Sequence, residues 1–186
     1  MRAAVKFMRP LPEPPDELEI LFREQHARVF RTAFRVTGNA VDAEDVLQNV
    51  FLRLIRGGDT YDIKNNPEAY LQRAAVNASL DLIRGRTRSK SVALADLETE
   101  PVGNKSQNPE VLQADRELAK LIRAAVARLG EKSAEMFVLR YYEGFENREI
   151  AEMLGTTQMV VGVMLHRARA RMRREIGQYL EKHHEA

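Results

Sequence analysis

The sequence predicts an all-α protein with two small helical domains joined by a flexible linker, the second containing a helix-turn-helix. Apolar residues recur at helical spacing through most of the chain, and strand-like alternation is scarce. Residues 91–108 are instead rich in Ser, Thr, Asn and acidic side chains, with too few large apolar residues to pack. A new helical pattern begins after this segment, so we expect a linker between two domains.

The composition is that of a packed protein, with 44% hydrophobic and 30% charged residues in 186. The absence of cysteine excludes disulfides and thiolate metal sites within this chain. No apolar run approaches the roughly 18 residues of a membrane span, and residues 1–15 lack the apolar stretch of a signal peptide. We therefore expect a cytoplasmic protein without membrane insertion.

The first domain is expected over residues 16–90, after an N-terminal extension, 1–15, that we expect to be disordered. Its first helix should begin at Asp16, a capping residue that follows two prolines, and end at the Thr-Gly-Asn break of 37–39. A second helix should span 41–56 before two glycines. A third should begin at Asn66-Pro67, because asparagine caps a helix and proline suits its first position, and continue to the basic cluster 84–90.

The second domain is expected over residues 109–186. Asn108-Pro109 repeats the same start signal, and the apolar stripe that follows it ends at Gly130. Further helices are expected over about 132–142, 147–154 and from 157 into the C-terminal tail. The last two are separated by Leu154-Gly155-Thr156, so they have the spacing of a helix-turn-helix.

The last helix has one apolar face and one basic face. Its spacing should bury Val161, Leu165, Ala168, Met172, Ile176 and Tyr179, and should direct His166, Arg167, Ala170, Arg173 and Arg174 outward. Arginines on such a face can neutralise DNA phosphates. An ordinary helical hairpin with a solvated arginine face is the alternative.

Two helices of the first domain also carry polar faces. In the third helix, Arg73, Asn77, Leu80 and Arg84 share a face that suits an unpaired base and its phosphates. Tyr61 and Tyr70 could stack on bases or pack in the core. The outward face of the second helix is expected to suit docking on a basic helix, or else to be merely solvated, and it comprises Asp42, Asp45, Gln48, Asn49, Leu52 and Arg56. Adjacent helical carboxylates diverge, so we expect no metal site there and no cofactor.

These patterns resemble one known family. Thr37-Gly38-Asn39, Asp42-Ala43-Glu44-Asp45, Gln48 and Val50-Phe51-Leu52-Arg53 resemble region 2.2 of extracytoplasmic-function sigma factors, group 4 of the sigma-70 family. The resemblance implies that the second helix binds the β′ clamp helices of core RNA polymerase, with the β subunit as a further contact.

The resemblance extends along the chain. Tyr70-Leu71, Arg73, Ala75-Val76-Asn77, Asp81 and Arg84 resemble regions 2.3 and 2.4, which melt and read the minus-ten element. It implies that single-stranded promoter DNA binds a set of aromatic, amide and basic residues, Tyr61, Tyr70, Arg73, Asn77, Arg84, Arg86 and Arg88. It also implies an anti-sigma factor that covers these surfaces.

Residues 141–169 resemble region 4, through Tyr141, Glu143-Gly144, Glu149-Ile150-Ala151, Leu154-Gly155 and Leu165-His166-Arg167-Ala168-Arg169. This implies that duplex DNA of the minus-thirty-five element binds at the start and along one side of the last helix, through Thr157, Gln158, Met159, Gly162, Val163, His166, Arg167, Arg169 and Arg173. The family usually has a Gly-Thr-Val-Lys-Ser-Arg-like run where this chain has 159–164. These apolar side chains either contact thymine methyl groups or serve a protein partner.

Two other classes of protein compete with a sigma factor. A stand-alone helix-turn-helix regulator would bind duplex operators without polymerase, and an interaction module would have lost DNA binding. An enzyme is not expected, because His26, His166, His183 and His184 form no evident catalytic group with an activated nucleophile.

Overall fold

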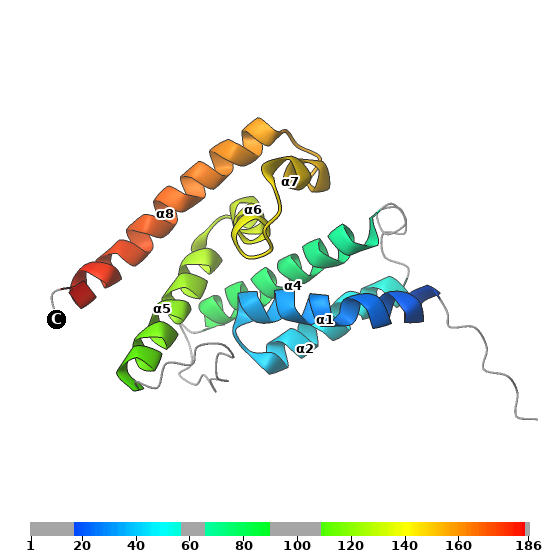
Figure 1. Cartoon of the computed structure of the whole chain (residues 1–186), viewed down its shortest axis with the longest axis horizontal. Helices are drawn as coiled ribbons and strands as arrows, with labels where there is room; N and C mark the ends of the chain where they lie inside the picture. The colour runs from blue at the N-terminus through cyan, green and yellow to red at the C-terminus, as the bar shows by residue number, and fades with distance from the viewer. Residues whose placement is uncertain (1–16, 57–65, 90–108, 185–186) are drawn as a thin grey trace, which may run out of the picture.

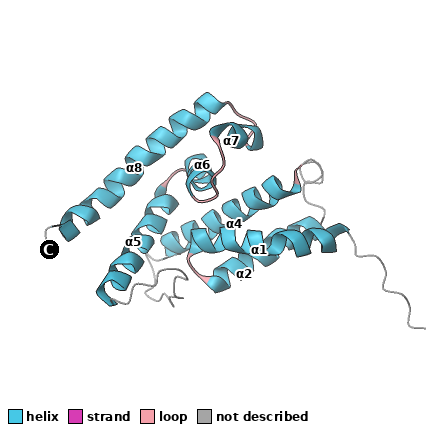
Figure 2. Ribbon diagram, in the orientation of Figure 1, coloured by secondary structure: helices cyan, strands magenta, loops and turns pink. Residues whose placement is uncertain are grey.

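Every regular element in the described part of the chain is an α-helix, as predicted. The protein was analysed as a computed structural model, which describes residues 17–56, 66–89 and 109–184. Figure 2 shows these residues as helices joined by short loops. The expected N-cap Asp16, the whole of the expected linker and Tyr61 lie outside the described residues.

The first group of helices comprises α1 (Glu17–Thr37), α2 (Ala40–Ile55) and α4 (Pro67–Ser89). Their inward stripes form one core of Val29, Ala33, Ala43, Val46, Val50, Phe51, Leu71 and Ala75. Full burial of a side chain such as Leu71 contributes about 1.5–3 kcal/mol. The three helices therefore form a bundle in which α4 packs against both partners.

The helix starts follow from local capping chemistry. The side chain of Asn39 accepts hydrogen bonds from the backbone of Val41 and Asp42, at 2.9 and 3.2 Å, so α2 starts one residue earlier than expected. Asn66 accepts from the backbone N–H of Ala69 at 3.0 Å, as its position before Pro67 predicts.

The second group comprises α5 (Pro109–Arg128), α6 (Glu131–Tyr141), α7 (Asn147–Met153) and α8 (Gln158–His184). Figure 1 shows α8 as a long helix along one side of the molecule, with α7 at its N-terminal end. The predicted inward positions Val161, Leu165, Ala168 and Met172 are all buried. Periodicity thus identified the packed face of α8 over these positions.

The two groups pack against each other. Val36 of α1 and Val76, Leu80 and Ile83 of α4 belong to the same core as residues of α5, α6, α7 and α8. In Figure 1, α6 lies over α4, and α5 runs beside one end of α4, in agreement with the contacts between these helices. The linker prediction gave no indication of this contact, because it depends on residues far apart in the sequence.

Candidate functional site

The outward face of α2 is an exposed surface of mixed chemistry. Asp45, Gln48, Asn49, Leu52 and Arg56 are all exposed, because they lie opposite the buried stripe of the helix. Two apolar neighbours that the sequence analysis did not assign extend the surface, Val41 and Ile55, which are 64% and 62% exposed. Exposed apolar side chains among polar ones are typical of a docking surface.

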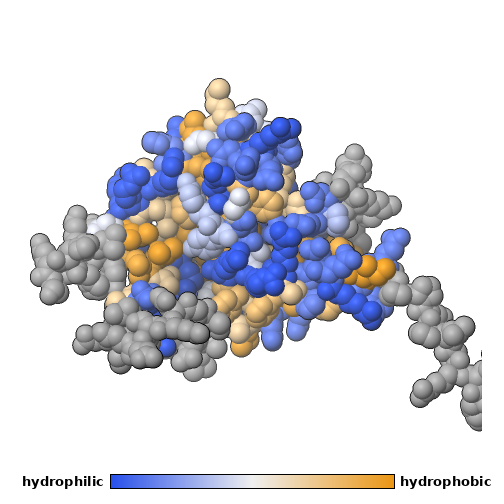
Figure 3. Space-filling view, in the orientation of Figure 1, coloured by the Kyte–Doolittle hydropathy of each residue, from blue (hydrophilic) through white to orange (hydrophobic). Residues whose placement is uncertain are grey.

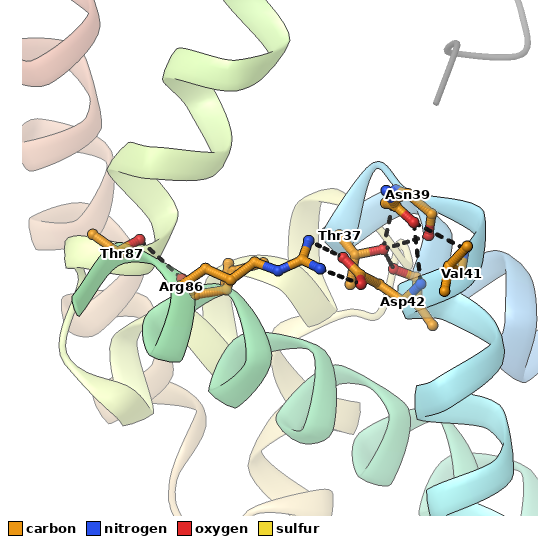
Figure 4. Close-up of polar contacts among 8 residues, drawn as sticks. Thr37, Asn39, Val41, Asp42, Arg86 and Thr87 are labelled. Atoms are coloured by element: carbon orange, nitrogen blue, oxygen red, sulfur yellow. Dashed lines mark hydrogen bonds and ion pairs between the residues drawn. The ribbon is translucent and has the colours of Figure 1, made fainter. Parts of the chain in front are cut away.

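Asp42 does not belong to that surface, which corrects the prediction that it points outward. Its side chain is buried, and both terminal nitrogens of the Arg86 guanidinium donate to its carboxylate, one of them at 2.6 Å. Figure 4 shows Arg86 reaching from α4 to the first turn of α2. Burial raises the pKa of Asp42, and the charge of Arg86 opposes this rise. Arg86 thus binds a carboxylate of its own chain.

The polar face of α4 meets α6. Arg73 Nε and Asn77 Nδ2 both donate to the same oxygen of Glu135, at 2.9 Å each. An Nη of Arg73 also donates to the backbone oxygen of Met153, at 2.9 Å. Two of the residues assigned to single-stranded DNA therefore have partners in the second group of helices.

Leu80 shares a face of α4 with Arg73 and Asn77, as expected, but it is fully buried, so the expectation that it points outward is wrong. It lies in the core that joins the two groups of helices. The prediction treated the first bundle alone, in which position 80 lies away from α1 and α2. Packing of α5 and α6 on this side of α4 makes the position interior.

The remaining candidates on α4 differ in exposure. Tyr70 is half-buried and packs against the core of the first bundle. Arg84 is mostly buried and lies 3.6 Å from the carboxylate of Asp81. Arg88 is exposed, in the last turn of α4. These candidates therefore differ in exposure, although their spacing puts them on the same side of α4 as Arg73 and Asn77.

A helix-turn-helix joins α7 to α8. Glu146 caps α7, and Glu149 accepts from the backbone N–H of Glu146 at 2.6 Å in a capping box, so α7 begins at Asn147 as predicted. Gly155 in the turn has φ of 59°, a left-handed conformation that favours glycine. Thr157 accepts from the backbone N–H of Val160 at 3.3 Å and so caps α8. Gly155 and Thr157 thus end one helix and start the next.

The start of α8 presents apolar side chains to solvent. Met159, Val160 and Val163 are 80%, 45% and 46% exposed. In Figure 3, hydrophobic colour interrupts the polar surface at the tip of the molecule where α8 begins. Gly162 is half-buried, and an added Cβ would only touch Asn147 at 4.0 Å. Close packing does not require glycine there.

Farther along α8, the candidate phosphate contacts lie on the solvent side. The exposed residues of the predicted set are Thr157, Gln158, His166, Arg167, Arg169 and Arg173. His166, Arg167 and Arg173 lie away from the buried stripe of the helix, so one side packs and the other is basic. Thr157 and Gln158 lie at the N-terminal end of α8. The geometry can neutralise a line of phosphates.

Other kinds of site find no support in the part of the chain that the structure describes. Within it, no group of three metal-ligating side chains comes together. His26 contacts the backbone oxygen of Phe22 at 2.9 Å, within its own helix. None of the described helices combines the length and apolarity needed to cross a bilayer.

Two family models match the chain, in the order of the two groups of helices. Sigma-70 region 2 matches residues 21–89, and Sigma-70 region 4 matches residues 119–172. The chain is 34% identical over 163 residues to the ECF RNA polymerase sigma factor SigE of Mycolicibacterium smegmatis, which covers 88% of this chain and 61% of that protein. It is 32% identical to the RNA polymerase sigma-E factor of Streptomyces avermitilis, covering 86% of this chain and 85% of that protein.

Solved structures share the fold. CnrH, determined in complex with the cytosolic domain of CnrY, matches 87% of this chain and 88% of its own chain, with a TM-score of 0.55 and 20% identity. The sigma factor RpoE from Bartonella quintana matches 84% of this chain and 94% of its own, with a TM-score of 0.53 and 18% identity. At these identities the likeness concerns the fold.

Proposed function

This chain belongs to the extracytoplasmic-function sigma factors of the sigma-70 family, and we propose that it directs core RNA polymerase to particular promoters and helps to open their minus-ten region. The observation that carries the proposal is the exposed face of α2, inside the segment that matches region 2. The matches to regions 2 and 4 do not favour the alternative, a stand-alone regulator of duplex operators.

In this proposal the first domain, 16–90, binds the polymerase. Asp45, Gln48 and Asn49 supply acid and amide groups, while Leu52 supplies an exposed apolar contact beside them. Charged groups at the edge of a docking surface steer and orient the partner, and apolar groups are desolvated on contact. A basic helix pair such as the β′ clamp helices fits this chemistry, and Arg56 marks one end of the surface.

DNA binding is divided between the domains. Arg73, Asn77, Arg84 and Arg88 would hold the unpaired minus-ten strand, with Tyr70 beside them and Arg86 released from Asp42. The second domain, 109–186, would bind upstream duplex DNA through α8. Its arginines would hold phosphates, while Met159 and Val163 could touch thymine methyl groups.

An anti-sigma factor is proposed as the regulatory partner. Support comes from a protein of similar fold, the sigma factor RpoE from Bartonella quintana, which was crystallised with the anti-sigma factor NepR. The exposed apolar residues on α2 and at the start of α8 offer surfaces for such a protein. We propose that the chain acts in the cytoplasm, where polymerase works, by binding and without catalysis of its own.

Reconstituted transcription tests the proposal. Purified chain would be mixed with core polymerase and fragments of the host genome, and transcripts would be mapped by sequencing. We expect transcripts that start at a small set of sites only when the chain is present. Absence of any stable complex with core polymerase would contradict the proposal. Specific footprints on duplex DNA without polymerase would favour the stand-alone regulator instead.

A further inference from the structure

The α4 face that carries Arg73 and Asn77 is partly covered by the second domain, and 38% of the Arg73 side chain stays exposed. Both side chains donate to Glu135 of α6, whose side chain is 11% exposed. Arg73 also holds the backbone oxygen of Met153, at the end of α7. The guanidinium of Arg73 and the amide of Asn77 therefore already donate hydrogen bonds to acceptors of the second domain. In a DNA complex, the same donors would bind a phosphate or a base edge.

A second polar contact joins α1 to the turn after α6. Thr32 donates to one carboxylate oxygen of Glu143 at 2.8 Å, and Arg35 lies 3.4 Å from the other oxygen. Arg35 also donates to the backbone oxygen of Tyr142, at 3.1 Å. The side chain of Glu143 is only 3% exposed, so this carboxylate is buried between its own turn and the first domain, where both of its oxygens meet donors from α1.

Between these polar contacts lies an apolar centre. Val36, Val76 and Leu80 are each no more than 1% exposed and share a core with residues of α5 and α6. The guanidinium of Arg123, on α5, lies so close to Gly38 that a Cβ there would come within 2.6 Å of it. An apolar centre with a rim of hydrogen-bonded polar groups is the anatomy of a specific interface.

We propose that this interface is an autoinhibitory contact, in which the free protein closes its second domain over the minus-ten surface and Glu135 occupies the donors that single-stranded DNA needs. The inference rests on the proposed function, because it presumes that Arg73 and Asn77 bind DNA. The closed arrangement has to open before the promoter strand reaches α4. Exposed Asp45 and Gln48 on α2 remain accessible in it, so polymerase can bind first.

The fraction of open molecules sets the expected change in DNA affinity. When only a fraction of molecules is open, the apparent affinity for DNA is reduced by that fraction. Hydrogen bonds and partly exposed ion pairs each contribute modestly, so removal of two carboxylates should open a substantial share of the molecules. A rise in apparent DNA affinity of about three- to tenfold is expected from that change.

The experiment uses the full chain. Because the protein has no cysteine, Ala27→Cys on α1 and Ala170→Cys on α8 introduce two dye sites at exposed alanines. Single-molecule energy transfer then reports the distance between the domains. We expect one narrow population for the otherwise unchanged chain, and a broader, shifted distribution when Glu135→Gln and Glu143→Gln are added.

DNA binding is measured in parallel on cysteine-free protein. The probe is a fluorescent single strand of random sequence, about 15 nucleotides long, followed by anisotropy. Glu131→Gln with Glu152→Gln is the matched control, because it removes the same charge from exposed positions of α6 and α7. The interface variant should bind the probe about three- to tenfold more tightly than this control.

A variant in the first domain distinguishes the effect of opening the interface on DNA affinity from the effect of removing negative charge. Thr32→Val with Arg35→Gln removes the donors to Glu143 and also removes a positive charge, which alone would weaken DNA binding. We expect tighter binding nonetheless. Thermal unfolding followed by circular dichroism checks that each variant is folded.

The inference would be overturned if the interface variants and the control had equal energy-transfer distributions and equal affinities for the DNA probe. A broad energy-transfer distribution for the otherwise unchanged chain would also overturn it. Neither outcome touches the proposed function, which depends on complex formation and transcription with core polymerase. Conversely, a closed chain that opens as expected but never binds polymerase would contradict the proposed function alone.

Discussion

Arg86, near the end of α4, donates through both terminal nitrogens to the carboxylate of Asp42, in the first turn of α2. The carboxylate is buried, whereas about half of the Arg86 side chain is exposed. Thr37 and Asn39 surround the same turn (Figure 4), and Asn39 caps the helix that begins there. One ion pair thus ties the start of the proposed polymerase-binding helix to the proposed DNA-binding helix.

This pair should make stability depend on pH in an unusual direction. Burial raises the pKa of Asp42 above its ordinary value of 3.8, and Arg86 opposes the rise without cancelling it. The folded protein then binds this proton more tightly than the unfolded chain does. The contribution of Asp42 is therefore full below the ordinary pKa and is lost as pH rises through the raised value.

Asp42→Asn provides the comparison. The free energy of unfolding from urea titrations, wild type minus variant, should fall as pH rises from about 3.5 and level off near neutral pH. At neutral pH the variant should differ from wild type by less than about 1 kcal/mol, since Arg86 stays partly solvated. A difference that grows with pH would mean that attraction to Arg86 outweighs burial.

Reversal of Asp45 should disrupt polymerase binding. Asp45 is exposed on α2, so Asp45→Lys should change the free energy of unfolding by no more than about 0.5 kcal/mol. A lysine facing a basic partner helix replaces attraction by repulsion, and we expect at least about a tenfold weaker complex with core polymerase. Glu24→Lys, the same charge change at an exposed position of α1, should bind normally. Equal binding by both variants would exclude this face of α2.

Asn77→Ala should impair promoter opening more than recruitment. The amide of Asn77 is assigned to the unpaired strand, and its loss leaves the face of α2 unchanged. Permanganate reactivity of unpaired thymines in the minus-ten region should fall by about five- to thirtyfold, while the affinity for core polymerase stays within about twofold, as loss of roughly 1–2 kcal/mol of base contact implies. A proportional loss of polymerase binding would instead indicate a folding defect.

Two arginines of α8 should bind phosphates of duplex DNA. Arg167 and Arg173 are exposed on the basic side of the helix. Replacement of each by alanine should weaken duplex binding uniformly across sequences and reduce the slope of log affinity against log salt by about 1. Anisotropy with duplex DNA at several KCl concentrations measures this slope, and Arg23→Ala on α1 is the control. An unchanged slope would show that these side chains contact no phosphate.

Sequence alone predicted the fold class and most helix boundaries, because caps and periodicity are local. Asn39 and Asn66 each precede a helix and hydrogen-bond to its first turn, as their types suggest. The buried stripe of α8, from Val161 to Met172, repeats at helical spacing and is buried as expected. The exposed face of α2, Asp42 excepted, follows from the same periodicity.

Tertiary structure decided which polar residues are accessible. Position 42 has the helical phase of an outward residue, but the end of α4 brings Arg86 against it. Leu80 and Asn77 lie on one side of α4, and only the arrival of α6 makes the first a core residue and pairs the second with Glu135. Partners separated by more than 40 residues leave no periodic signal, because that signal reports the direction of a side chain along its own helix and not what packs against it.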